Sequence, residues 1–287
     1  MTNDLALKHS AAAGRALDQG NLERAAEGFT FAIRHAPDWA TPWYNLGLVR
    51  KLQRRWPESL ACNQRATALD PANEAAWWNA GIAATAIGDW AAARTAWLGF
   101  GLALPPGDSE PRMDLGHVPI RLAQPDGPIV WCQRIDPARA MVGSALPPSS
   151  GYRYGDILLH DGAPRGTQLL GEQEVPIFDM LALLAPSAYR SFAVTVHAES
   201  GAALATLARG ASDHGLGVED WDDVRRSCLA VDSAASDDDR QATLLLATLD
   251  DDALRHVVLR WQELFPKSVA LAIESLPAPA DAPIAGL

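Results

Sequence analysis

The sequence repeats itself near its N-terminus with a period of 34 residues. The stretch "APDWATPWYNLGLV", which begins at Ala36, returns in altered form as "DPANEAAWWNAGIA", which begins at Asp70. Proline, tryptophan, asparagine and glycine keep their places in both copies. A period of this length is typical of solenoids, in which each unit buries its apolar face only against the next unit. The repeat therefore predicts a stacked array for the first part of the chain.

Aligned at this period, the chain gives three units, 6–39, 40–73 and 74–107. Their spacing of Trp, Gly, Ala, an aromatic residue and a final Pro resembles the tetratricopeptide repeat (TPR). The resemblance implies an N-terminal α-solenoid of three helical hairpins, and hence a protein-binding role. The first unit has His9 where the tryptophan is expected, which fits a terminal cap. Each unit closes on an equivalent proline: Pro37, Pro71 and Pro105.

The resemblance also implies a concave surface lined by the first helix of each unit. Tyr44 and Trp78 directly follow the first tryptophan of the second and third units, and we expect them on this surface. Exposed aromatic side chains are frequent hot spots for a bound segment. The predicted partner-binding residues are Tyr44, Leu48, Lys51, Trp78, Ile82 and Thr85.

An alternative for this apolar stripe stays open, because it could instead pack against the second domain or against residues 108–127. Repeats that grip the C-terminal carboxylates of chaperones present several basic and amide side chains, whereas Lys51 is the only basic residue of this stripe. We therefore do not predict that activity. A separate basic group near the turn of the second unit could meet an anionic partner or the acidic second domain: Arg50, Lys51, Arg54 and Arg55.

The negative charge of the chain lies in its second part. Residues 1–107 carry a net charge of +1, and the remainder carries −12. An acidic surface repels nucleic-acid phosphates and attracts basic proteins, so the predicted partner is another protein. The alternative is a solvated face that only promotes solubility.

The remaining composition predicts a cytoplasmic protein without a cofactor or metal. The three cysteines are far apart, which argues against a disulfide framework and against a thiolate zinc site. No apolar run approaches the roughly 20 residues of a membrane-spanning helix. The N-terminus lacks the pattern of a signal peptide. Neither a nucleophile elbow, nor a zinc-protease pair, nor a phosphate-binding glycine loop is present in the sequence.

The second part of the chain predicts an α+β region after the TPR domain of residues 1–107. A linker over 105–114 leads into the acidic domain 108–287, in which residues 115–185 show short strands between turns and suggest a small barrel or a curled sheet. Residues 189–276 show two strand–helix–strand units, which indicates a ferredoxin-like fold. One expected strand is "SCLAVDS" (227–233), and residues 277–287 are expected to form a flexible tail.

The most site-like stretch of the second part is "GYRYGDILLHDGAPRG", with Tyr152, His160 and Asp161 among glycines. His160 beside Asp161 could serve as a base or a metal ligand. The alternative is a turn in which His160 is only a polar residue. The stretches "VWCQRIDPARA" and "YGDILLHDGAP" resemble uncharacterised bacterial domains linked to TPR units, a resemblance that implies no settled activity.

These observations favour a non-catalytic adaptor that binds another protein through the TPR groove and the acidic domain. A sharper version is an immunity protein that neutralises a basic bacterial toxin. One alternative is an enzyme with a site around Tyr152–Asp161 whose repeats recruit the substrate. Another is a chaperone or assembly factor for a secreted effector.

Overall fold

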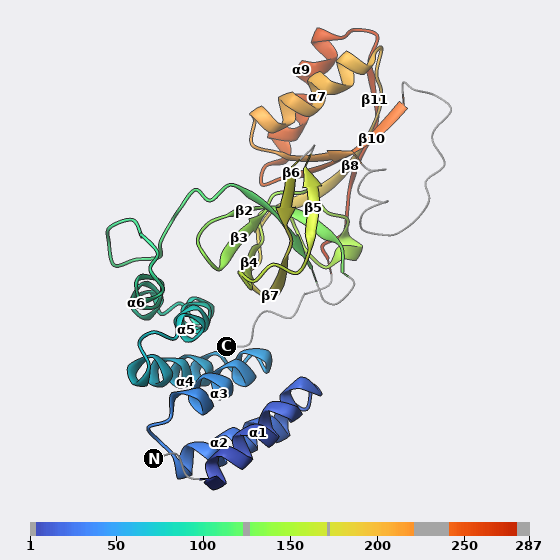
Figure 1. Ribbon diagram of the computed structural model, residues 1–287. Helices are drawn as coiled ribbons and strands as arrows, with labels where there is room; N and C mark the ends of the chain where they lie inside the picture. The colour runs from blue at the N-terminus through green and yellow to red at the C-terminus, as the bar shows by residue number, and fades with distance from the viewer. Residues whose placement is uncertain (1–3, 123–126, 171–172, 221–240, 280–287) are drawn as a thin grey trace. The chain divides into compact units, whose positions relative to one another are not determined.

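The computed structural model describes residues 4–122, 127–170, 173–220 and 241–279 (Figure 1). The chain divides into two compact units. The helical unit comprises Met1–Asp114 together with Ile135–Ala138, and the sheet-rich unit comprises Leu115–Arg134 and Arg139–Gly286. The domain boundary predicted after residue 107 stays a prediction.

Six helices form the helical unit, two for each predicted repeat. Their ends follow the 34-residue period, so the first helix of a pair begins just after the proline that closes the preceding unit. This arrangement agrees with the expected solenoid of helical hairpins. The helices are α1 (Asp4–Asp18), α2 (Leu22–His35), α3 (Ala40–Leu52), α4 (Trp56–Leu69), α5 (Glu74–Ala86) and α6 (Trp90–Phe100).

The tryptophan and proline of the repeat are joined by a hydrogen bond that is itself repeated. The Trp43 indole Nε1–H donates to the Pro37 carbonyl oxygen over 2.9 Å. The Trp77 Nε1–H donates to the Pro71 carbonyl oxygen over 3.0 Å. Since each indole also belongs to a helix of the following unit, the bond fixes the connection between one hairpin and the next.

The glycine of the repeat is required by close packing within each hairpin. A Cβ placed on Gly47 would lie 2.4 Å from the Asn63 side chain, and one placed on Gly81 would lie 2.5 Å from the Trp97 ring. Both distances are far below van der Waals contact. The two helices of a hairpin therefore approach so closely that any side chain at these positions would force them apart.

Gly81→Ala is expected to lower the free energy of unfolding by about 1–3 kcal/mol, because the new methyl group overpacks the Trp97 ring. This outweighs the gain of roughly 1 kcal/mol that alanine brings to a helix interior. Gly14→Ala in α1 is the matched control, since apart from its own helical turn no described residue comes within 4 Å of the added Cβ. Urea unfolding should show the two substitutions with opposite signs, and equal effects would contradict the close approach.

The sheet-rich unit begins with a closed barrel of five strands, in the order β1-β2-β3-β4-β7. Neighbouring strands pair antiparallel except β1 and β7, which close the barrel in parallel. The structure thus forms the barrel that the sequence allowed, with β7 as a strand the sequence did not indicate. The strands are β1 (His117–Arg121), β2 (Ile129–Arg134), β3 (Arg139–Val142), β4 (Ile157–His160) and β7 (Phe178–Ala185), with a separate hairpin of β5 (Thr167–Leu170) and β6 (Gln173–Pro176).

A four-stranded antiparallel sheet follows, in the order β11-β8-β10-β9, and two helices pack on it (Figure 1). Among the described residues, the strand that follows α7 is β9, and the expected strand "SCLAVDS" (227–233) lies outside them. Residues 280–287 of the expected tail also lie outside them. The elements are β8 (Arg190–His197), α7 (Gly201–Asp213), β9 (Gly217–Asp220), β10 (Gln241–Thr248), α9 (Asp251–Leu264) and β11 (Val269–Ser275).

Helix length and hydropathy bear on the expectation that the chain has no membrane-spanning helix. Within the part of the chain that the structure describes, no helix combines the length and the apolar character needed to cross a membrane.

Candidate functional site

The six predicted partner-binding residues lie on α3 and α5, and they differ in exposure. Tyr44, Leu48 and Trp78 are half-buried. The other three are interior: the exposed fraction is 6% for Lys51, 0% for Ile82 and 2% for Thr85. Only Tyr44, Leu48 and Trp78 could therefore contact a partner directly. Their role stays a prediction.

The contacts of two of these residues show that they also stabilise the helical unit. The Lys51 ammonium donates to the Asn79 side-chain oxygen over 2.9 Å and so links α3 to α5. The Trp78 ring meets the rings of Trp97 and Phe100 edge to face, with centroids 5.0 Å and 4.8 Å away. Trp78 is consequently part of the α5–α6 packing and not a purely exposed residue.

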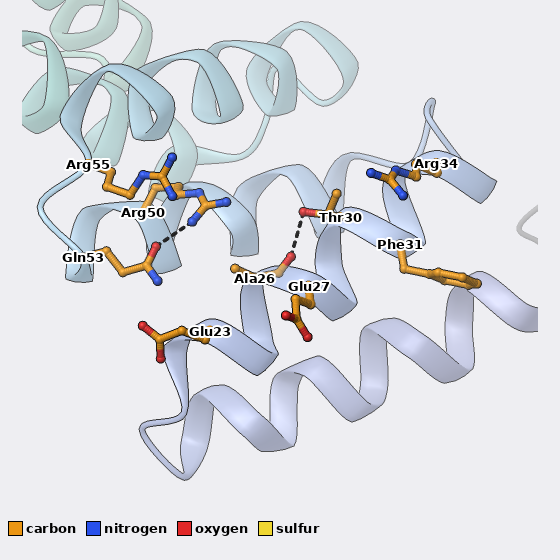
Figure 2. A pocket seen from close by; sticks show the side chains of 9 residues that line it. All are labelled: Glu23, Ala26, Glu27, Thr30, Phe31, Arg34, Arg50, Gln53 and Arg55. Carbon is orange, nitrogen blue, oxygen red and sulfur yellow. Dashed lines mark hydrogen bonds between the residues drawn. The ribbon is translucent and has the colours of Figure 1, made fainter.

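A pocket of about 480 Å³ lies beside α2 and was not indicated by the sequence (Figure 2). One wall is a stripe along α2, and the other is formed by residues around the turn between α3 and α4. A volume of this size is typical of ligand-binding clefts. Its lining residues are Glu23, Ala26, Glu27, Thr30, Phe31, Arg34, Arg50, Gln53 and Arg55.

The α2 wall carries charges of both signs. Glu23 and Glu27 come from the first half of the helix, and Arg34 from its last turn, an order that suits the helix dipole. Among the described residues these three side chains form no hydrogen bond or ion pair. They are therefore available to a ligand in the pocket.

The opposite wall is basic. Arg50 donates to the Gln53 side-chain oxygen over 2.7 Å (Figure 2). This acceptor is a neutral amide, so the bond does not neutralise the charge of Arg50. Arg55 instead holds Glu58, with its Nη2 2.6 Å from the carboxylate, and this contact lowers the pKa of Glu58. Since both groups of the Arg55–Glu58 pair are about half exposed, the pair contributes little to stability.

An aromatic stack borders the pocket at Phe31. The Phe31 ring lies between two imidazoles, with ring centroids 3.8 Å from His9 and 4.2 Å from His35. The stack holds the half-buried ring in place, so that Phe31 offers an apolar contact at one end of a charged pocket.

The sequence indicated only one wall of this pocket, through the basic group at residues 50–55. The residues of the α2 wall were not singled out in the sequence. A usable signal was present, since Glu23, Glu27, Thr30 and Arg34 recur at steps of three or four and so share one face of a helix.

The stretch Tyr152–Asp161, the candidate for an enzyme site, is largely interior. Tyr152 belongs to the barrel core. The Asp156 carboxylate accepts the backbone N–H groups of Arg153 and Ser187, over 2.8 Å and 2.7 Å, so it holds a turn together. His160 has no exposed surface and cannot reach a substrate in this conformation.

Neither metal binding nor thiol chemistry finds support in the side chains of the described residues. Among them, no group of three or more His, Cys, Asp or Glu side chains could hold a metal ion. Burial raises the pKa of the Cys62 thiol to about 11 and that of Cys132 to about 12. Both thiols are protonated at neutral pH and hence poor nucleophiles.

Known proteins with similar structures correspond to the first third of the chain. The second TPR domain of Spaghetti (RPAP3), bound to an HSP90 peptide, is 21% identical, with a TM-score of 0.33, over 34% of this chain and 90% of that one. The first third resembles tetratricopeptide-repeat domains. The TPR2B domain of yeast Sti1 is 19% identical, with a TM-score of 0.33, over 34% of this chain and 78% of that one. The Sgt2 TPR domain from Aspergillus fumigatus is 19% identical, with a TM-score of 0.32, over 34% and 65%.

No protein-family model and no curated protein matches the sequence.

Proposed function

We propose that the protein is a cytoplasmic adaptor that binds a segment of another protein along the TPR groove. The observation that carries this proposal is the pair Tyr44 and Trp78, which occupy equivalent positions 34 residues apart and stay partly exposed on α3 and α5. Two aromatic side chains at a regular spacing suit an extended or helical segment laid across both helices.

The six predicted residues take two roles in this proposal. Tyr44, Leu48 and Trp78 contact the partner directly, because part of each side chain is exposed. Lys51, Ile82 and Thr85 lie beneath the surface and set the spacing of α3 and α5.

Tyr44→Ala is expected to weaken partner binding by about tenfold or more, as loss of a hot-spot aromatic residue does. The test is affinity capture from the native cytoplasm at low salt, followed by calorimetry with the purified partner. Leu98→Ala, on the exposed face of α6, is the control and should bind like the wild type. Absence of a stoichiometric partner, or equal binding by both variants, would contradict the adaptor role.

A sharper form of the proposal is an immunity protein that neutralises a basic bacterial toxin. Its support is the net charge of −11, which attracts a basic protein over long range. We also infer that residues 189–276 form a ferredoxin-like domain, supported by the order β-α-β-β-α-β of the described elements and by the sheet order β11-β8-β10-β9. A neutral or acidic captured partner would remove the toxin hypothesis while leaving the adaptor role intact.

The chaperone or assembly-factor alternative makes the same binding prediction and differs only in the partner captured. The enzyme alternative has less support, because His160 is fully buried and Asp156 holds a turn.

A further inference from the structure

The turn between α3 and α4 contains a backbone conformation that is unfavourable for its residue. Arg54 has φ +57°, and it is the only non-glycine with positive φ in the described part of the chain. The equivalent positions of the first and third units, 34 residues to either side, are Gly20 with φ +72° and Gly88 with φ +71°. A residue with a Cβ is strained in this region, whereas glycine is not. The second unit therefore keeps an arginine where its neighbours use the residue that the turn favours.

Strain of this kind is often retained for a function, and the surroundings of Arg54 point to one. Arg54 is exposed, and among the described residues its guanidinium has no hydrogen-bond or ion-pair partner. Its chain neighbours Gln53 and Arg55 both line the pocket beside α2, as does Arg50 (Figure 2). Arg54 itself is not one of the lining residues, and the strained turn thus adds an exposed cation to the segment that forms the basic wall.

We propose that the pocket beside α2 is a second docking site, which binds an acidic segment of a partner protein. Arg50 and Arg54 receive the acidic side chains, since guanidinium–carboxylate hydrogen bonds are among the strongest that side chains form. Phe31 contacts an apolar side chain further along the segment. The site uses α2 and the α3–α4 turn rather than the Tyr44–Trp78 stripe, so it goes beyond the proposed function and does not depend on it.

The glutamates of the pocket decide between a peptide and a nucleic acid. Glu23 and Glu27 line the same pocket as the arginines, so two carboxylates face any ligand along the α2 wall. A polynucleotide bears a negative charge at every phosphate and would be repelled along the α2 wall. A peptide can place its carboxylates at the arginines and a neutral or apolar residue beyond them. The fitting ligand is therefore a short acidic cluster followed by apolar residues.

The test uses three fluorescein-labelled probes and fluorescence anisotropy at low salt. The first is a nonapeptide with three glutamates followed by two leucines, in a Gly-Ser frame. In the second, lysines replace the glutamates, and the third is a ten-nucleotide oligothymidylate. The full-length protein is expected to bind the first probe and neither of the others.

Two substitutions separate binding from folding. Arg54→Gly installs the residue found in the other two turns, so the thermal midpoint should be unchanged or higher while affinity for the acidic peptide falls about tenfold. Arg50→Gln should weaken binding similarly, and Arg54→Lys should retain most of it. Arg15→Gln, on the exposed surface of α1, is the control for net charge and should bind like the wild type.

Three results would each overturn the proposal. They are failure of the acidic peptide to bind, equal binding of the lysine peptide or the oligothymidylate, and an unchanged affinity of Arg54→Gly. Loss of binding in Arg15→Gln to the same degree would also overturn it, because the effect would then be one of net charge alone. None of these results bears on Tyr44→Ala, so the two proposals fail separately.

Discussion

Trp97→Ala is expected to lower the free energy of unfolding of the helical unit by about 3–5 kcal/mol, the range for removing a fully buried aromatic side chain. The exposed fraction of Trp97 is 0%, and its ring lies directly over Gly81. Its edge-to-face contact with Trp78 is lost as well. Because Gly81 on the facing helix has no side chain that could fill the space left by the ring, a large cavity remains.

One effect acts in the opposite direction. The buried Trp97 indole N–H has no hydrogen-bond partner among the described residues, and its removal recovers a desolvation penalty of about 1–3 kcal/mol. The lost burial is larger, so destabilisation wins, and we expect a value near the lower end of the range.

Urea unfolding followed by the helical circular-dichroism signal measures this change. Leu98→Ala is the matched control, because Leu98 follows Trp97 in α6 and is 58% exposed. Its effect should stay within about 0.5 kcal/mol. A loss below about 1 kcal/mol for Trp97→Ala would mean that the α5–α6 hairpin does not depend on this ring.

The helical unit could be predicted from the sequence because its determinants are local and repeated. Pro37 and Pro71 mark the ends of helices, and their tryptophan partners lie only six residues away. Gly47 and Gly81 recur where a side chain of the second helix lies directly against the backbone of the first. Each of these residues makes its contact within one repeat or with the next repeat. The 34-residue period therefore predicts these contacts from the sequence.

The exposure of side chains on the predicted stripe could not be read in the same way. Tyr44 and Ile82 belong to the same predicted surface, yet one is half-buried and the other has no exposed surface. The difference depends on which neighbouring elements cover each residue, and a helical period does not carry this information. The pocket beside α2 was missed for a related reason, since its walls come from two different repeats.

The sheet-rich unit depends on pairing over long distances in sequence. β1 pairs with β7 in parallel, with Ile120 opposite Phe178. No local sequence pattern predicts that these two strands close the barrel. β7 is buried along most of both faces, so it lacks the alternation that marks a half-buried strand. β9 was not indicated by the sequence, because it is only four residues long and two of them, Glu219 and Asp220, are acidic.

The stability of the sheet-rich unit is expected to fall as the pH drops below 6.5, because of His160. This residue lies at the end of β4, opposite Met180 of β7, and its imidazole has no exposed surface. Burial, reinforced by the positive charge of Arg134, lowers the pKa of His160 to about 4, from an ordinary value of 6.5. The imidazole is therefore neutral in the folded protein near neutral pH.

The sign follows from the protons bound in each state. Between pH 6.5 and about 4 the unfolded chain protonates this histidine while the folded chain does not, so protons favour unfolding. Stability from the neutral ring is fully present above pH 6.5 and is lost as the pH falls towards the folded pKa. At about 1.4 kcal/mol for each pKa unit, the loss amounts to about 3 kcal/mol.

His160→Leu tests this directly, because leucine fills a similar volume and does not titrate. Its stability near neutral pH should equal or exceed that of the wild type, since a fully buried polar ring is replaced by an apolar side chain. Urea unfolding at a series of pH values should then show a curve flatter than that of the wild type by about 3 kcal/mol between pH 6.5 and 4. His117→Leu, on the exposed end of β1, is the control and should keep the wild-type slope. Carboxylates titrate alike in all three proteins, so an unchanged slope in His160→Leu would mean that the folded protein protonates His160 as readily as the unfolded chain does.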